Sequence, residues 1–218
     1  MQWTRSLLML GMPACFITAV YQMPFDDVWA VFWAAPLGAA GLAVLVVRER
    51  SPIRRWLALA LGMVGTGIAL RPGLGTLGAA TGLAVGMAAC FALYIVMTRL
   101  LRTEGTATNL LYTALGVFLA LGVAAPAFWK PLTVTALVPM VGVGLVGFLG
   151  LYALDRSLAQ AEVSAVAPFL YLQAVFALPI PVMSGEGISR SALAGTSVIV
   201  VMAIWHLFSE VRQFGSVS

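Results

Sequence analysis

Eight stretches of the chain contain no charged residue, and their lengths restrict the fold more than any other feature. A helix needs about 20 apolar residues to cross a bilayer, and seven of these stretches are long enough on their own. The short stretch 56–70 reaches that length if Arg54, Arg55 and Arg71 extend their side chains to the interfaces. Alternating segments typical of a membrane barrel are absent, so we expect an all-α, polytopic transmembrane bundle of eight spans. The eight stretches are 6–25, 28–47, 56–70, 72–98, 105–129, 131–154, 163–185 and 191–209.

The composition excludes most other classes of protein. Only 9% of the 218 residues are charged and 61% are hydrophobic, whereas a soluble domain has about 25% charged residues. The net charge of +4 does not indicate nucleic-acid binding, because the arginines are dispersed between apolar runs. Cys15 and Cys90 lie inside apolar runs, and His206 is the single histidine. We therefore expect no metal site, no cofactor and no catalytic residues.

The basic residues predict the orientation in the membrane. With the N-terminus inside and the spans alternating, nine basic residues fall on the inner side and three on the outer side. The positive-inside rule then places both termini in the cytoplasm of a bacterium, with the chain in its inner (plasma) membrane. The strongest single contribution is the loop "RERSPIRR" at 48–55, to which we assign an orientation role and no ligand. The inner set is Arg5, Arg48, Arg50, Arg54, Arg55, Arg99, Arg102, Arg156 and Arg212, and the outer set is Arg71, Lys130 and Arg190.

Two segments of the chain resemble each other. Residues 35–70 and 167–207 each begin with Ala-Pro inside a span, continue to a polar loop with a glutamate, and end in an apolar helix. Their first helices are five spans apart, so the two copies run in opposite directions. This predicts an inverted repeat, an architecture that many secondary transporters share.

The order of short motifs carries a resemblance to a known family. In the first part these are "RSLLMLG", "FDDVWAVFWAAPL", "RERSPIRRW" and "GMVGTGIALRPG". In the second part they are "MAACFALYIVMTRLLR", "GFLGLYALDRSLAQAEVSAVAPFLYLQAVFA" and "SGE". Over residues 5–210 the chain resembles the drug/metabolite transporter superfamily, EamA type.

The resemblance implies ten helices in two inverted five-helix repeats around a central cavity. Measured against that pattern, this sequence lacks the first two helices of the N-terminal repeat. We expect residues 1–72 to form a partial first repeat of three helices and residues 73–218 a complete second repeat of five.

Two functions fit these observations. The first is a transporter, and in particular an exporter, of small organic metabolites or drugs by alternating access. The second is a truncated, non-transporting paralogue, or a structural membrane protein that assembles with a partner. An enzyme is not expected, because no arrangement of catalytic groups is present. The expected partners are the lipid bilayer and a small-molecule substrate, and either a homo-oligomer or a partner subunit fits as well.

Polar and aromatic residues within the spans are the candidate substrate-binding residues, because such groups are costly in a membrane. Gln173 lies in mid-span, and the resemblance implies a role for Tyr94. Asp155 is the nearest candidate for a proton-coupling carboxylate. The same positions also fit ordinary packing and interfacial anchoring. The expected cavity-lining set is Trp33, Pro36, Tyr94, Tyr152, Tyr171 and Gln173.

Small residues indicate where helices approach one another closely. Gly78, Gly82 and Gly86 follow at spacing four, and Gly62 with Gly65 and Thr66 form a weaker version of this pattern. We expect close helix packing at both faces. A third glycine-rich span contains Gly142, Gly144, Gly147 and Gly150.

Overall fold

The computed structural model describes residues 1–71, 79–128, 133–179 and 188–215. Within these ranges the chain forms helices and no strands. Seven of the helices are long and apolar enough to cross a membrane. The predicted all-α, polytopic transmembrane class is therefore confirmed.

The first part of the chain contributes three of these spans. The second is built from three consecutive pieces, because Pro36 stands at the first turn of its middle piece and cannot donate a backbone hydrogen bond. The elements are α1 (Gln2–Val20), α2 (Phe25–Phe32), α3 (Ala35–Leu42), the π-helical η1 (Ala43–Val47) and α4 (Ile53–Leu70).

The second part contributes four spans and one interrupted apolar helix. The elements are α5 (Ala79–Leu100), α6 (Thr106–Phe128), α7 (Val134–Gln160), α8 (Val163–Val166), the 3₁₀-helical η2 (Ala167–Leu172), α9 (Gln173–Phe176) and α11 (Arg190–Gly215).

The expected eighth span at 163–185 is wrong for the described residues. Helical structure there runs from Val163 to Phe176, which is shorter than a bilayer crossing requires. The interruption begins next to Pro168, where the backbone tightens into a 3₁₀-helix. Residues 180–185 of that stretch lie outside the described residues.

The short stretch 56–70 does become a full span. Helix α4 begins at Ile53 and includes Arg54 and Arg55, as the sequence suggested. Arg55, however, does not extend to water, because it is 8% exposed and bound by carboxylates.

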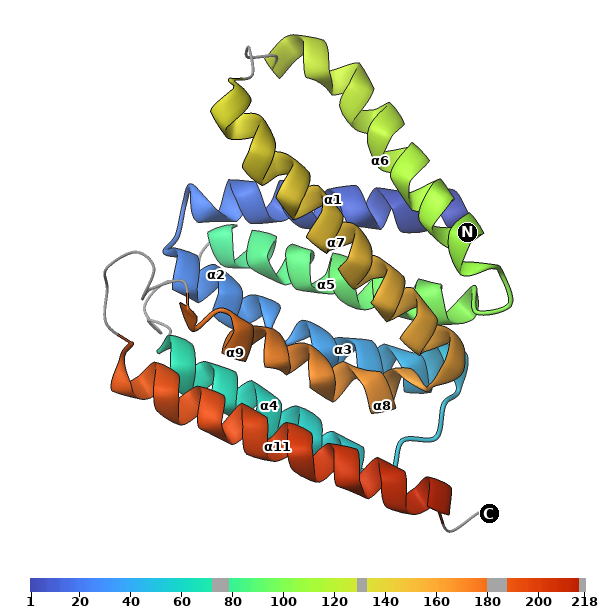
Figure 1. The fold of residues 1–218 in the computed structure, drawn as a ribbon, viewed down its shortest axis with the longest axis vertical. Coiled ribbons are helices and arrows are strands. Elements are labelled where there is room, and N and C mark those ends of the chain that lie inside the picture. Colours follow the sequence, from blue (N-terminus) through green and yellow to red (C-terminus); the bar gives the residue numbers. More distant parts are fainter. Residues whose placement is uncertain (72–78, 129–132, 180–187, 216–218) are drawn as a thin grey trace.

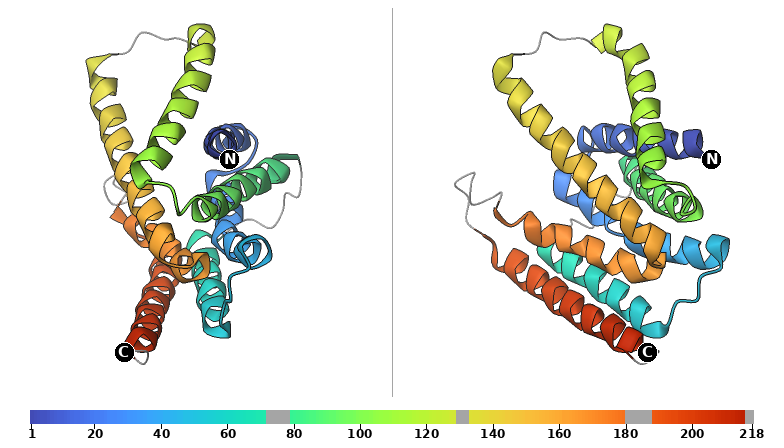
Figure 2. Two further views of the ribbon diagram at one scale, coloured as in Figure 1. Left: turned by 90° about the vertical axis from the view of Figure 1, so that its right-hand side faces the viewer. Right: turned by 45° about the vertical axis from the view of Figure 1, so that its right-hand side comes forward.

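The helices form a layered bundle in which the two broken segments occupy the middle. Figure 1 shows α4 and α11 side by side along one edge, with α2–α3 and α8–α9 next to them. Helices α5 and α1 follow on the other side, and α1 packs against both α5 and α6. The upper parts of α6 and α7 project away from the bundle, as the two turned views in Figure 2 also show.

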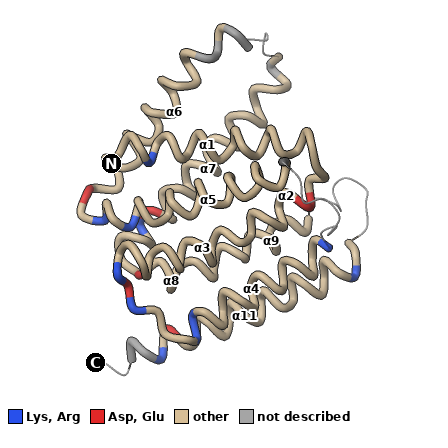
Figure 3. The backbone as a smooth tube through the Cα atoms, turned by 180° about the vertical axis from the view of Figure 1, so that it is seen from behind, with Lys and Arg blue, Asp and Glu red and all other residues tan. Residues whose placement is uncertain are grey.

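Charged residues are confined to the two ends of the bundle. In Figure 3 the middle of the tube carries almost no charge, and most basic and acidic residues gather at the end that contains Arg99 and the loop at 48–52. We call this the charged end. The other end, where α2 begins and α4 finishes, is the second end. The 1–47 segment passes from one end to the other and back, as the sequence predicted.

Helices α4 and α11 cross at two glycines without side chains between them. A Cβ atom on Gly195 would overlap the carbonyl oxygen of Gly65 and the backbone of Ala69. A Cβ atom on Gly62 would overlap the ring of Tyr171 in η2. The weaker small-residue pattern of α4 therefore marks the closest helix contact among the described residues.

The other glycine patterns are packed less tightly. Gly86 would meet the sulfur of Cys15 on α1 at an ordinary 3.4 Å, and Gly82 has open space beside it. Gly78 lies outside the described residues. The four glycines of α7 have no neighbouring atom within 4 Å of an added Cβ. The spacing of glycines in the sequence therefore did not predict which helix face packs most closely.

The α4–α11 crossing yields a stability prediction. Gly195→Ala should lower the free energy of unfolding by about 1–3 kcal/mol, because the added methyl meets backbone that cannot rotate away. The matched control is Gly67→Ala on α4, where nothing lies within 4 Å of the added atom. Scanning fluorimetry in detergent should show a lower melting temperature for Gly195→Ala and no decrease for Gly67→Ala. Equal melting temperatures for the two variants would contradict the close crossing.

Candidate functional site

A cavity of about 380 Å³ lies between α2, α4, α9 and α11. It reaches from the second end, at Phe25 and Leu70, to the middle of the bundle at Trp33 and Gln173. Most of its wall is apolar, and alanines keep it open on the sides of α4, α9 and α11. The lining residues are Phe25, Asp26, Trp29, Trp33, Ala69, Leu70, Gln173, Ala174, Ala177, Leu178, Ala192 and Thr196.

Stacked aromatic rings form one wall of the cavity. The ring centroids of Trp29 and Trp33 are 6.1 Å apart, and those of Trp33 and Tyr171 are 5.7 Å apart. Each pair is tilted by 33°. Phe25 continues the row beyond Trp29, with a centroid distance of 5.9 Å. The cavity therefore has a row of ring faces and edges along α2.

A hydrogen bond joins the two broken segments at the inner part of the cavity. The hydroxyl of Tyr171 in η2 donates to the carbonyl oxygen of Trp33 at 3.1 Å. Trp33 is the last residue before the break between α2 and α3. In a bilayer such a carbonyl has no water to bind, so Tyr171 satisfies a group that the helix break has freed.

The structure brings together some of the predicted residues and separates others. Trp33 and Gln173 line the cavity, and Tyr171 stacks against Trp33. Pro36 is buried at the first turn of α3. Tyr94 lies elsewhere, with the guanidinium of Arg5 5.5 Å from its ring, and Tyr152 is 46% exposed on α7.

Several lining residues are absent from the expected cavity-lining set, although Trp29 lies one helical turn before Trp33 on the same face. Phe25, Trp29 and Trp33 are spaced four apart, which places them on one face of a helix, so this signal was present in the sequence. Asp26 lies beside them at the start of α2. Thr196 and the alanines of α11 carry no such signal, because only the packing of α11 against α4 brings them to the cavity.

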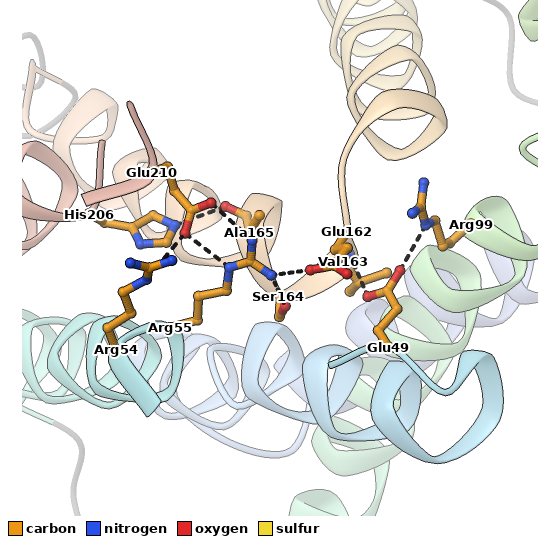
Figure 4. A network of polar contacts seen from close by, with 10 residues as sticks. All are labelled: Glu49, Arg54, Arg55, Arg99, Glu162, Val163, Ser164, Ala165, His206 and Glu210. Atoms are coloured by element: carbon orange, nitrogen blue, oxygen red, sulfur yellow. Dashed lines mark hydrogen bonds and ion pairs between the residues drawn. The ribbon is translucent and has the colours of Figure 1, made fainter. Parts of the chain in front are cut away.

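Ion pairs fasten the charged end of the same helices. Figure 4 shows Arg55 of α4 between two glutamates from the other half of the chain. It donates to both carboxylate oxygens of Glu210, at 3.0 and 2.9 Å, and also to Glu162. The nitrogen that binds Glu162, Nη1, also donates to the hydroxyl of Ser164 at 3.1 Å. Arg55 thus joins α4 to α8 and α11.

A second ion pair lies next to the first. Glu49 accepts a hydrogen bond from Arg99 of α5 at 2.8 Å and another from the backbone N–H of Val163 at 2.9 Å. Arg99 also donates to the carbonyl of Leu158 at 2.7 Å. The loop to which the sequence analysis gave only an orientation role therefore supplies a carboxylate that joins α5, α7 and α8. We call these residues the ion-pair network: Glu49, Arg55, Arg99, Glu162 and Glu210.

The cavity and the ion-pair network lie at opposite ends of the same helices. Arg55 and Ala69 are 14 positions apart on α4, which is about 21 Å along the helix axis. On α11 the cavity touches Thr196 and the network holds Glu210. The two ends therefore differ in lining: the cavity at the second end is mostly apolar, whereas a wide hollow of about 670 Å³ at the charged end is lined by Glu49, Arg55 and Glu162 of the ion-pair network.

A separate buried cluster surrounds Arg5 of α1. Its guanidinium pairs with Asp155 at 3.3 Å, and donates to Thr113 at 2.9 Å and to the carbonyl of Asn109. Asn109 in turn donates to Asp155 at 3.1 Å. Asp155 is therefore bound within α1, α6 and α7 and does not line the cavity.

The described parts of the chain contain no group of three or more His, Cys, Asp or Glu side chains placed to hold a metal ion.

Arg55 generates a prediction with its neighbour as control. Arg55→Ala leaves Glu162 and Glu210 without their main partner, and should lower the free energy of unfolding by about 3 kcal/mol. Arg54→Ala removes a more exposed arginine that is 3.9 Å from Glu210. This substitution should change the free energy of unfolding by less than about 1 kcal/mol. Melting temperatures in detergent check both values. A smaller effect at Arg55 than at Arg54 would be inconsistent with the network as described.

Curated proteins with related sequences are bacterial transporters. The chain is 28% identical over 185 residues to a riboflavin transporter of Vibrio cholerae, which covers 82% of this chain and 59% of that protein. It is 25% identical over 189 residues to an S-adenosylmethionine uptake transporter of Rickettsia bellii, covering 86% and 65%. The chain thus spans less than two thirds of the length of either relative.

A solved crystal structure shares the fold. It superposes with a TM-score of 0.78 at 18% sequence identity, over 93% of this chain and 74% of the other. No protein-family model matches the chain. Taken together with the seven apolar helices, the comparisons describe a multi-pass helical membrane protein whose homologues are named transporters.

Proposed function

We propose that the chain is a transporter of the bacterial inner membrane that moves a small organic metabolite across the bilayer through the cavity beside Trp33. The observation that carries this proposal is the difference between the two ends. The mostly apolar cavity reaches the second end, while at the charged end ion pairs join the same helices beside a separate hollow that shares no lining residue with the cavity. In alternating access, a substrate site is open to one side at a time.

The drug/metabolite transporter superfamily, EamA type, is the family that we propose. The ordered motifs and the named transporters among the relatives support it. Both broken segments contain an Ala-Pro pair at the start of a new helical piece, at Ala35–Pro36 and at Ala167–Pro168. This shared break supports an inverted repeat made of residues 1–72 and 73–218. The proposal includes no enzymatic step and no cofactor.

The orientation follows from the charges. Arg5, Arg55 and Arg99 lie at the charged end, which the positive-inside rule places in the cytoplasm together with both termini. The cavity then opens to the outside of the cell. Export remains our prediction for direction, and the relatives named for S-adenosylmethionine are uptake transporters, so the assay has to measure both directions.

Within this proposal the cavity residues have separate roles. Trp29 and Trp33 offer ring faces to the substrate, with the buried Tyr171 stacked behind Trp33, and Gln173 offers an amide donor and an acceptor. Pro36 maintains the helix break that exposes the carbonyl of Trp33. Tyr94 and Tyr152 lie away from the cavity and are not assigned to the substrate.

The experiment is transport by the purified 218-residue chain in proteoliposomes. Labelled riboflavin and S-adenosylmethionine are the first probes, because both contain a flat, nitrogen-containing ring system and both occur in the names of relatives. Uptake and efflux are measured separately. Trp33→Ala and Gln173→Leu should lower the initial rate at least about fivefold, while Tyr152→Ala should leave it within about twofold. Circular dichroism and membrane abundance serve as folding controls.

The substitutions also separate substrate handling from folding. If Gln173→Leu reduces only the amount of protein in the membrane, Gln173 has a packing role and is not a substrate residue. If Tyr152→Ala abolishes transport as strongly as Trp33→Ala, the cavity beside Trp33 is not the route. Loss at Trp33 and Gln173 alone supports the proposal.

Helix α7 favours a second candidate function, namely a membrane protein that assembles with a partner. None of its best apolar window, within Thr135–Gln160, is buried within the chain. Its glycines at 142, 144, 147 and 150 have no neighbour, and such faces accept other helices in membranes. Two results together would favour this candidate. The chain would insert and fold normally but transport neither probe, and its Gly144→Cys variant would form a crosslink to another membrane protein.

A further inference from the structure

We propose that the cavity binds flat aromatic molecules that are neutral or positively charged, and that it rejects anions. This inference rests on the proposed function only in taking the cavity as the substrate site. It adds the chemical class of the substrate, which neither the fold nor the sequence pattern assigns.

The first step is the shape of the aromatic wall. Trp29 and Trp33 line the cavity with ring centroids 6.1 Å apart, and the fully buried Tyr171 supports Trp33 from behind at 5.7 Å, each pair tilted by 33°. Offset stacking of a flat ring on such faces is favourable, and the same faces attract a cation. The volume of about 380 Å³ is near the lower end of small-molecule sites, which are about 300–1,000 Å³. It therefore fits one compact ring system.

The second step is the charge of the lining. Among the described residues that line the cavity, Asp26 is the only charged one, and it is acidic. No described basic side chain forms an ion pair with it, since the ion pairs of the described chain involve other carboxylates. An anion that leaves water is stabilised best by a cationic partner, and no described residue of this lining is cationic. A cation, in contrast, gains both Asp26 and the ring faces.

The third step concerns hydrogen bonds. The indole N–H of Trp29 is buried and has no acceptor in the described chain. The amide of Gln173 is exposed at the cavity. A bound molecule with an acceptor atom on its ring edge would satisfy the N–H of Trp29, and a donor and acceptor pair would match Gln173. Buried donors gain most from such pairing, because their unpaired state is costly.

No described arginine lines the cavity: Arg71 follows Leu70 and Arg190 precedes Ala192 by two residues, but both are exposed and neither belongs to the lining. Arg55 and Arg99 are held by glutamates at the charged end, and Arg55 is about 21 Å from the cavity along α4. Arg5 is held by Asp155. Their positive charge is thus compensated locally and does not reach the cavity.

The test uses three fluorescent probes with the same tricyclic skeleton and different charges. They are 9-aminoacridine as the cation, 9-anthracenemethanol as the neutral molecule and 9-anthracenecarboxylate as the anion. Binding to the full chain in nanodiscs is measured by energy transfer from tryptophan, and empty nanodiscs correct for partition into lipid. We expect the anion to bind at least tenfold more weakly than either of the other two.

Two substitutions separate stacking from charge. Trp33→Ala should weaken binding of the cation and of the neutral probe at least fivefold, and Trp33→Phe should restore most of it. Asp26→Asn should weaken the cation about fivefold relative to the neutral probe. Equal binding of the anion and the cation would overturn the inference. The inference would also be overturned if Asp26→Asn weakened binding of the cation and of the neutral probe by the same factor.

Binding and transport can fail independently. If the probes bind in the expected order but the proteoliposomes show no transport, the binding inference stands and the transport proposal fails. If the chain transports a substrate and binds the anionic probe best, the transport proposal stands and the inference fails.

Discussion

A bilayer provides no water to a buried charge or to a broken backbone, and the arrangement of this bundle follows from that constraint. Each break and each buried charge described above has an internal partner. Tyr171 donates to the carbonyl freed at Trp33, Arg55 pairs with two glutamates, and Arg5 pairs with Asp155. These partners come from distant parts of the sequence, so the same interactions that satisfy the groups also fix which helices are neighbours.

The closest contact in the bundle depends on the absence of side chains. Helices α4 and α11 approach until Gly65 and Gly195 meet backbone to backbone, and Gly62 leaves room for the ring of Tyr171. This approach places Thr196 of α11 in the lining of the cavity. At the charged end, it places Glu210 of α11 beside Arg55 of α4. One packing arrangement therefore sets both the floor of the cavity and the position of the ion-pair network.

Some of this could be predicted from the sequence, for physical reasons. Charge-free length predicts spans because a charge in mid-bilayer is costly, and the all-α class was confirmed on that basis. The span at 163–185 was wrong because apolar composition does not reveal that Pro168 opens a 3₁₀ segment. Trp33 and Gln173, expected to line a cavity because they are polar or amphipathic groups in mid-span, do line one in the structure. Asp26 and Thr196 were not in the expected set, because only the packing of α4 against α2 and α11 makes them neighbours. Arg55 was interpreted as an orientation signal, since a sequence shows a charge and not its partner.

The ion-pair network also bears on how such a bundle could open at the charged end. Arg55 lies on α4, while Glu162 and Glu210 belong to the other half of the chain, so that end cannot separate without breaking these pairs. Removing one partner of a buried pair costs about 3–5 kcal/mol when the remaining charge stays dry. Opening the charged end would instead admit water to every separated charge, and exposed pairs are worth only about 0–1 kcal/mol. The net cost of opening is therefore far smaller than the cost of a substitution. Under the proposed transport function, such a network would hold the helices together at the charged end while leaving their separation within reach of a substrate's binding energy.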